Sequence, residues 1–353
     1  MAFALVAATA TAAAAQTAPS GARVEVEAYG SLSHQFDTGA AALALPVAGA
    51  PITTSSPLFP SRRVSSWLFG DGATLLNDVN AQLGVAARVT PLDAAIATFG
   101  RDAQDGVAGG IRLRLRTSEH VWLEAAVDLA PSRAGLSPEA TTAIEQTRSS
   151  FVTAMTALLA TGPFTGTVVT ATAAADNGQP RDLTATLAAN MEFAPVSGVT
   201  PYVTLGAGLI TSTGTAPAFT LDARYRTRIL GSVPIDESDH VAVRGTASTA
   251  PVVVIGAGLR REMTEHLHIR VDARLIAANR TISTNLDATP TVATGTPADF
   301  IESFTNPSVQ FSNNTSTGRR STLSGDAYDH LEVATSTRLQ LRGLVTIGVA
   351  VRF

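Results

Sequence analysis

The chain has 353 residues, enough for one large domain or two of ordinary size, and only 15% of the residues are charged. Its net charge of −4 at pH 7 argues against a nucleic-acid-binding protein, since such proteins carry a basic footprint. The absence of cysteine excludes disulfide bonds and thiolate chemistry, and it is compatible with an oxidising compartment.

The N-terminal segment predicts an export signal. Residues 1–15 are almost entirely apolar or small, and they end on AAA before Gln16, a typical cleavage pattern. We therefore expect residues 1–15 to be a signal peptide and residues 16–353 to form a single barrel domain. No later run approaches the roughly 18 apolar residues of a membrane-spanning helix, so a helical membrane protein is not expected.

Beyond the signal, apolar and polar residues alternate in eight separate runs. In the first run Val26 and Leu32 share one face, while Glu25 and Glu27 lie on the other. A period of two predicts a β-strand whose two faces meet different environments. In chain order, the predicted strands lie near 23–36, 107–116, 120–129, 183–193, 201–212, 251–262, 266–279 and 337–353.

The connections between these strands alternate in length. Only a few residues join strands two and three, four and five, and six and seven. The long loops are 37–106, 130–182, 213–250 and 280–336. Short turns at one end and long loops at the other predict an all-β fold, an antiparallel up-and-down transmembrane barrel with extracellular loops. A soluble β-sandwich gives no reason for this asymmetry.

The charges of the strands gather on one face. Arg112 and Arg114 alternate with Ile111 and Leu113, for example. A charge that faces lipid at the bilayer centre costs roughly 2–4 kcal/mol, so the charged face is predicted to line the lumen. The predicted lumen network consists of Arg23, Glu25, Glu27, Arg112, Arg114, Arg116, Glu124, Asp128, Glu192, Arg260, Arg270, Asp272, Arg274, Arg342 and Arg352. We expect these charges to be paired, because an unpaired charge in a narrow lumen is costly.

The chain ends on GLVTIGVAVRF, an alternating strand whose final residue is Phe353. Together with the eight runs, this ending resembles the family of small eight-stranded outer-membrane β-barrels typified by the OmpA transmembrane domain. The resemblance implies the outer membrane of a Gram-negative-type bacterium, with the lipid bilayer and lipopolysaccharide as surroundings. It also implies that the barrel-assembly machinery reads Phe353. No peptidoglycan-binding domain follows the predicted barrel, so no cell-wall tether is implied.

The long loops carry further predicted elements. Residues 219–230 and 240–247 alternate like strands, and we interpret them as a hairpin in which strands five and six continue beyond the membrane. A ten-stranded barrel that includes this pair is the alternative. Helices are predicted within 137–162, where Ser137 can act as the N-cap, and within 90–100. We expect these helices to pack on other loops.

The leading functional hypothesis is a structural or surface-interaction role through the extracellular loops, whose ligand is unknown. A narrow pore is the alternative, and the surplus of lumen arginines would make it prefer anions. An outer-membrane hydrolase is a weaker hypothesis. It is based on the pairs Asp239-His240 and Asp329-His330, but adjacent residues in a strand point to opposite faces. The sequence shows no cluster of metal ligands at the usual spacing, no phosphate loop and no nucleophile elbow. We therefore expect no enzymatic activity, bound metal or cofactor.

Overall fold

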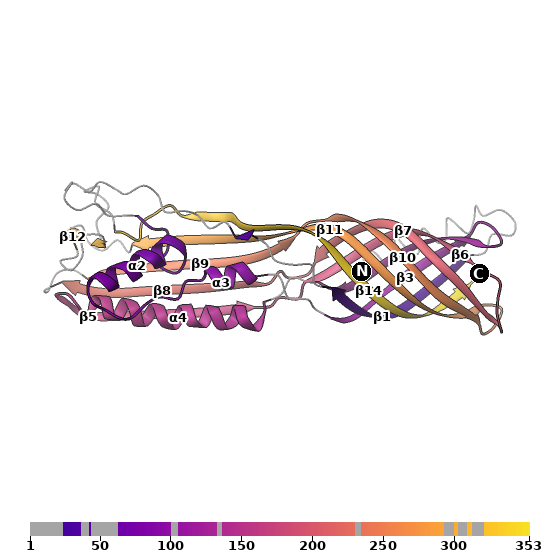
Figure 1. Cartoon of the computed structure of the whole chain (residues 1–353), viewed down its shortest axis with the longest axis horizontal. Coiled ribbons are helices and arrows are strands. Elements are labelled where there is room, and N and C mark those ends of the chain that lie inside the picture. The colour runs from indigo at the N-terminus through magenta and orange to yellow at the C-terminus, as the bar shows by residue number, and fades with distance from the viewer. Residues whose placement is uncertain are drawn as a thin grey trace.

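The computed structural model of the chain describes residues 24–36, 42–43, 63–99, 105–132, 136–229, 234–292, 300–302, 309–312 and 321–353. The predicted signal peptide lies outside these residues. The described part forms a barrel with an elongated sheet-and-helix unit at one of its ends (Figure 1). None of the helices in this part is long and apolar enough to cross a membrane.

Eight antiparallel strands close the barrel. In spatial order they are β1 (Val24–Phe36), β3 (Gly106–Arg116), β4 (Val121–Pro131), β6 (Arg181–Glu192), β7 (Val199–Thr213), β10 (Ala250–Glu262), β11 (Leu267–Val292) and β14 (Tyr328–Arg352). Closure comes from β14, which pairs with β11 on one side and with β1 on the other, where Glu25 lies opposite Arg352. The closed ring satisfies the backbone of each strand on both of its sides.

Side-chain alternation places the apolar residues outside the barrel and the charged residues inside it. On β1, Leu32 is 68% exposed, whereas Glu25 and Glu27 are fully buried. On β14, Ile347 is 62% exposed and the preceding Thr346 is buried. An aliphatic outer wall around a polar interior is the reverse of a soluble barrel, and it is the arrangement that a lipid surrounding requires.

The structure confirms the predicted fold class, and short turns join β3 to β4, β6 to β7 and β10 to β11 as expected. The ten-stranded alternative is wrong. The described part of the predicted pair, residues 219–229 and 240–247, belongs to β8 (Ala218–Ile229) and β9 (Ile235–Ala247), which pair with each other outside the barrel ring.

The strands that continue beyond the barrel are the seventh and eighth, not the fifth and sixth as predicted. The fifth, β7, ends at Thr213, and the sixth, β10, begins only at Ala250. By contrast, β11 and β14 have 26 and 25 residues, and they remain paired from the turn end of the barrel out to Ala288 and Tyr328. A membrane-spanning strand needs only about 10 residues. The remainder of both strands therefore projects outside.

The projecting halves of β11 and β14 begin a second sheet. The outer half of β11 pairs with β9, β9 pairs with β8, and β8 pairs with β5 (Phe164–Asp176). The short β2 (Ala42–Leu43) pairs with β14. A separate two-stranded sheet consists of β12 (Phe300–Glu302) and β13 (Gln310–Ser312). We call the second sheet that β11 and β14 begin, together with the helices that cover it, the extension.

Three helices cover one face of the extension sheet (Figure 1): α2 (Gly70–Gln82), α3 (Asp93–Thr98) and α4 (Pro138–Leu159). Both predicted helices are present as α3 and α4. As predicted, Ser137 caps α4: its Oγ accepts a hydrogen bond from the Ala140 backbone N–H at 3.1 Å. The helix α2 and the strand β5 were not predicted.

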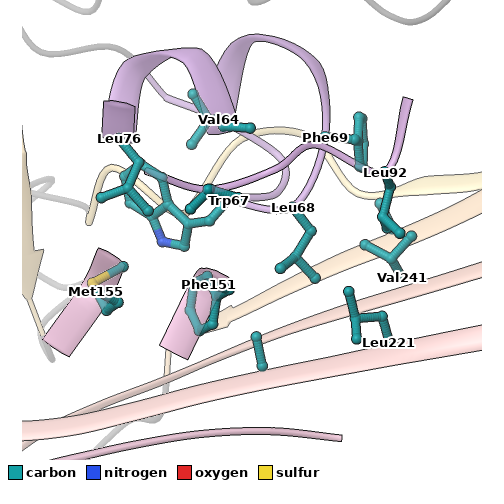
Figure 2. Close-up of a cluster of buried hydrophobic side chains, with 14 of the residues drawn as sticks. Val64, Trp67, Leu68, Phe69, Leu76, Leu92, Phe151, Met155, Leu221 and Val241 are labelled. Atoms are coloured by element: carbon teal, nitrogen blue, oxygen red, sulfur yellow. The ribbon is translucent and has the colours of Figure 1, made fainter. Parts of the chain in front are cut away.

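The extension has its own apolar core, shown in Figure 2. Trp67 and Leu68, which precede α2, and Phe151 of α4 pack against Leu221 of β8 and Val241 of β9. All five side chains are buried. The helices therefore rest on the projecting sheet, and large parts of the segments predicted as loops form a folded unit.

Candidate functional site

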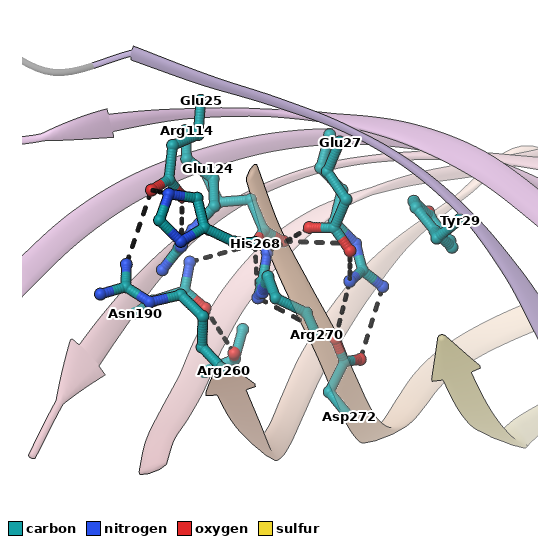
Figure 3. Close-up of polar contacts among 12 residues, drawn as sticks. Glu25, Glu27, Tyr29, Arg114, Glu124, Asn190, Arg260, His268, Arg270 and Asp272 are labelled. Atoms are coloured by element: carbon teal, nitrogen blue, oxygen red, sulfur yellow. Dashed lines mark hydrogen bonds and ion pairs between the residues drawn. The ribbon is translucent and has the colours of Figure 1, made fainter. Parts of the chain in front are cut away.

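The lumen collects charged side chains because every second residue of each strand points inward. In the described part of the chain, equal numbers of arginines and carboxylates are buried there. They are Arg112, Arg114, Arg260, Arg270, Arg274, Arg280 and Arg342, and Glu25, Glu27, Glu124, Asp128, Asp182, Glu192 and Asp272. Figure 3 shows part of this network, with side chains from different strands pointing toward one another across the barrel.

Two carboxylates bridge two arginines near the middle of the lumen. The Nη1 atom of Arg112 lies 3.2 Å from Glu27 Oε1 and 2.7 Å from Asp272 Oδ2. Arg270 also forms an ion pair with Glu27, and the Tyr202 hydroxyl donates a hydrogen bond to Asp272 at 2.9 Å. Each carboxylate thus has more than one donor, which offsets the cost of taking it out of water.

Glu124 of β4 is the point where arginines from two other strands converge. Arg274 Nη1 lies 2.6 Å from Glu124 Oε1, and Arg270 Nη1 lies 3.4 Å from its Oε2. The Nε atoms of Arg112 and Arg114 each lie 3.9 Å from the same carboxylate. A single negative charge therefore helps to neutralise four guanidinium groups carried by β3 and β11.

At the short-turn end, Glu25 and Glu192 share arginines from three strands. Glu25 lies 2.9 Å from Arg114, 2.8 Å from Arg352 and 3.5 Å from Arg260. Glu192 lies 3.2 Å from Arg114 and 2.9 Å from Arg260. The two ion pairs of Glu192 and the pair between Glu25 and Arg260 link strands that are not neighbours in the barrel wall.

At the end nearest the extension, Asp182 binds two arginines. Arg280 Nη1 lies 2.7 Å from its Oδ1, and Arg342 forms a further ion pair with its Oδ2. Nearby, Tyr29 donates a hydrogen bond to Asp128. Asp182 and Arg280 were not predicted as lumen residues, because the predicted strands 183–193 and 266–279 stopped one residue short of each. Both continue the inward-facing parity of their strands, and that signal would have found them.

The buried lumen residues that the structure describes do not hold the surplus of arginines that the sequence predicted. Seven arginines and seven carboxylates are buried there. Arg116 lies at the turn after β3, where it donates hydrogen bonds to the backbone oxygens of Ser118 and Glu119, each at 3.1 Å. Arg352 lies at the mouth with its side chain 10% exposed, and Arg23 lies outside the described residues. Among the buried lumen residues that the structure describes, the predicted basis for anion preference is therefore absent.

Aromatic rings fill the space between the charges. The guanidinium carbon of Arg112 lies 3.8 Å from the ring centroid of Tyr29, and that of Arg114 lies 4.7 Å from Trp122. Such cation–π contacts stabilise desolvated arginines. Arg112, Arg114 and Trp122 are at most 1% exposed. These three side chains in the middle of the lumen are therefore shielded from water.

The structure separates the first predicted Asp-His pair. Asp239 points into the core of the extension, where its Oδ2 accepts hydrogen bonds from Ser66 Oγ at 2.9 Å and from the Trp67 backbone N–H at 2.7 Å. His240 lies on the opposite, exposed face and contacts Asp222 at 2.6 Å. The prediction that these adjacent residues point to opposite faces is confirmed.

The same prediction is wrong for the second pair. His330 Nδ1 lies 2.6 Å from Asp329 Oδ1. The register of β14 shifts here, so that Asp329 and His330 together lie opposite Asp287 alone. His330 adopts a positive φ of 53°. This bulge, which the local sequence does not reveal, turns both side chains to the same side.

Burial changes the protonation of the extension core. It raises the pKa of Asp239 to about 7, and the hydrogen bonds from Trp67 and Ser66 only partly oppose this shift. Burial also raises the pKa of Tyr225 well above its ordinary value, with the adjacent Glu237 carboxylate acting in the same direction. The charge of this polar cluster therefore depends on pH near neutrality.

Comparisons with known proteins give no close relative. Neither a family model nor a curated protein matches the chain. Among solved structures, it is similar to the toluene transporter TodX of Pseudomonas putida at 8% identity, over 95% of this chain and 90% of that chain, with a TM-score of 0.17. A Pseudomonas aeruginosa FadL homologue matches at 6% identity, over 94% and 89% of the two chains, with a TM-score of 0.15. The outer membrane protein opdK of Pseudomonas aeruginosa matches at 8% identity, over 95% and 99%, with a TM-score of 0.09. At these TM-scores the likeness carries no argument about function.

The class of the protein follows from its own geometry. A closed antiparallel barrel with an aliphatic wall, a charged interior, short turns at one end and long excursions at the other has the architecture of outer-membrane β-barrels. The particular role of this barrel depends on what its lumen and its extension do.

We expect the extension to lose stability as the pH rises from about 4 to about 7. The pKa of Asp239 in the folded state, about 7, lies above its ordinary value of 3.8, so the folded state binds the proton more tightly. Stability is therefore fully present below the ordinary pKa and is lost as the pH rises through the folded-state pKa. A shift of this size corresponds to a loss of about 4 kcal/mol.

Asp239→Asn tests this expectation, because the amide oxygen still accepts hydrogen bonds but the group cannot ionise. Proteolysis of the extension in increasing urea, at about pH 5 and about pH 8, measures its stability in each state. The variant is expected to flatten the pH dependence. Asp222→Asn, on the exposed face, is the control and retains most of it. An equal pH dependence in wild type and Asp239→Asn would show that another group is responsible.

Glu124→Gln is expected to destabilise the barrel by roughly 3–5 kcal/mol, because it leaves four arginines without their shared buried counter-charge. Urea unfolding of the refolded protein, followed by the gel shift between heated and unheated samples, measures the loss. The control is Glu119→Gln in the exposed β3–β4 turn. Equal stability of the two variants would mean that the network at Glu124 contributes little.

Proposed function

We propose that this protein is an outer-membrane β-barrel with a closed lumen, and that the barrel anchors the extension outside the cell, where the extension interacts with external partners. The observation that carries the proposal is the path of β11. Arg270 and Asp272 of this strand are buried in the lumen network, while Leu286 and Ala288 are buried in the extension core. One strand thus joins the filled barrel rigidly to the outer unit.

The aliphatic outer wall supports a membrane location. Leu32, Val107, Leu187, Leu205 and Ile347 are each 62–73% exposed, and they come from five different barrel strands. Exposed apolar surface of this extent is unfavourable in water. In the proposal it contacts the lipid bilayer. The long excursions of such barrels lie outside the cell, so lipopolysaccharide surrounds the barrel end next to the extension.

The position and exposure of Phe353 support its recognition during barrel assembly. The Phe353 backbone N–H donates a hydrogen bond to Val24 O at 2.9 Å, at the seam between β14 and β1. The Phe353 side chain is 74% exposed, and the chain ends at the side of the barrel away from the extension (Figure 1). In the proposal the barrel-assembly machinery recognises this accessible aromatic residue.

A narrow, anion-preferring pore is less well supported than a closed barrel. Such a pore needs a water-filled path and an excess of positive charge, whereas the described lumen has its centre filled by Arg112, Arg114, Arg270 and Trp122 and has balanced buried charges. The proposal assigns the protein no catalytic role and no cofactor.

Single-channel recording tests the closed lumen. The purified, refolded protein in a planar bilayer is expected to give no discrete current steps, because the lumen side chains leave no path for ions. The gel shift between heated and unheated samples confirms folding beforehand. Discrete steps from folded wild type would contradict the proposal. Replacing Arg112 and Arg114 by Gln would then show whether arginine sets the ion preference.

Phe353→Ala tests the assembly signal. We expect less of the variant to reach the folded, heat-shifted form in the outer membrane of cells, because the aromatic side chain is absent from the closing strand. Refolding of the purified variant in detergent should match wild type, since the exposed Phe353 side chain lies outside the lumen network. Unchanged levels in the outer membrane would show that Phe353 is not the signal.

A further inference from the structure

The projecting ends of β11 and β14 bring together three potential metal ligands that are far apart in the sequence. Asp287 comes from β11, and Asp329 and His330 come from β14. One ligand atom from each side chain lies within 4.8 Å of the other two. We propose that these three side chains bind a divalent transition-metal ion such as Zn²⁺. This inference goes beyond the proposed function and does not depend on whether the lumen conducts.

The distances are close to those that a metal ion requires. His330 Nδ1 lies 2.6 Å from Asp329 Oδ1 and 3.5 Å from Asp287 Oδ1. Zinc binds nitrogen and oxygen ligands at about 2.0–2.2 Å, so neighbouring ligand atoms in a tetrahedral site lie roughly 3.3–3.6 Å apart. Small side-chain rotations at Asp329 and His330 convert the direct contact into a ligand pair, and both side chains have room to make them, being 91% and 70% exposed.

Asp287 is the more firmly held ligand. Its side chain is only 21% exposed, and its Oδ1 accepts a hydrogen bond from the His330 backbone N–H at 2.6 Å. A hydrogen bond donated to a metal-binding carboxylate holds that carboxylate in one orientation. The bulge in β14 then presents Asp329 and His330 toward this carboxylate, so the arrangement does not depend on the flexible end of a loop.

The donor set selects the class of metal. One imidazole nitrogen and two carboxylate oxygens suit Zn²⁺ better than Ca²⁺, which prefers six to eight oxygen ligands. The two negative charges balance the charge of a divalent ion. With three protein ligands, a water molecule or an external group can occupy a further position.

The position of the site in the extension predicts that a bound metal ion stabilises the folded extension. Asp287 and Asp329 flank the segment 293–327, which contributes Val309, Phe311 and Leu323 to the extension core. A metal ion that binds the folded extension and not the unfolded chain stabilises the folded state by mass action, and this site lies at the base of a long segment. We therefore expect bound metal to protect the extension against unfolding.

The first test is calorimetric titration of the tag-free, refolded full chain with Zn²⁺, and separately with Ca²⁺. Wild type is expected to show saturable Zn²⁺ binding at one site and much weaker Ca²⁺ binding. His330→Gly removes the imidazole, and glycine tolerates the positive φ of this position, so the backbone is preserved. The variant is expected to bind Zn²⁺ roughly tenfold more weakly or worse.

The matched control is His240→Ala. His240 lies on the same sheet and also pairs with an aspartate, Asp222, but this pair supplies only one carboxylate. Zn²⁺ binding by His240→Ala is expected to equal that of wild type. Absence of saturable binding in wild type, or equal binding by wild type and His330→Gly, would overturn the proposal.

A second readout separates loss of a ligand from loss of fold. Zn²⁺ is expected to slow proteolysis of the wild-type extension and to leave Asp329→Asn and His330→Gly unchanged. Both variants should still show the heat-dependent gel shift of the intact barrel. Equal protection of wild type and the two variants by Zn²⁺ would place the metal elsewhere and contradict the site.

Discussion

The pairing of β11 with β14 is the interaction on which both parts of the molecule depend. At the turn end this pairing closes the barrel, because β14 pairs with β11 on one edge and with β1 on the other. Farther along the same two strands it supplies the base on which β9, β8 and β5 assemble. Because one continuous ladder serves both purposes, the extension is held in a fixed relation to the barrel wall.

Electrostatics then decides what the barrel contains. A barrel of eight strands is just wide enough for its side chains, so buried charges have little water and must neutralise one another. The shared carboxylates Glu25, Glu27 and Glu124 do this by accepting from several strands at once. Small residues make room for them: a side chain at Gly348 would collide with Glu27. Neutralisation of the charges and dense filling of the described lumen are thus consequences of the same packing.

The extension follows the opposite rule, since its core is mainly apolar and its outer face is polar. Phe219, Leu221 and Tyr225 of β8 pack beneath the helices, while Asp222 and Arg224 of the same strand face outward. A single chain thus alternates polar-inside segments, suited to lipid, with apolar-inside segments, suited to water. The change occurs along β11 itself, where the inward residues pass from Arg and Asp to Leu and Ala.

The sequence by itself determined the barrel. Its period of two, its order of short and long connections and the restriction of charges to one face predicted the eight strands, and the Ser137 cap predicted α4. These signals are local, because side-chain alternation and capping involve residues close together in the chain.

The tertiary structure decided the remainder. Strand β5 finds its partner strand in β8, where Ala171 lies opposite Ala223. Asp239 meets its partner Trp67 across 172 positions. Asp287 meets His330 only because a bulge shifts the register of β14. Such contacts arise from long-range strand register and packing, and neither leaves a periodic trace in the sequence.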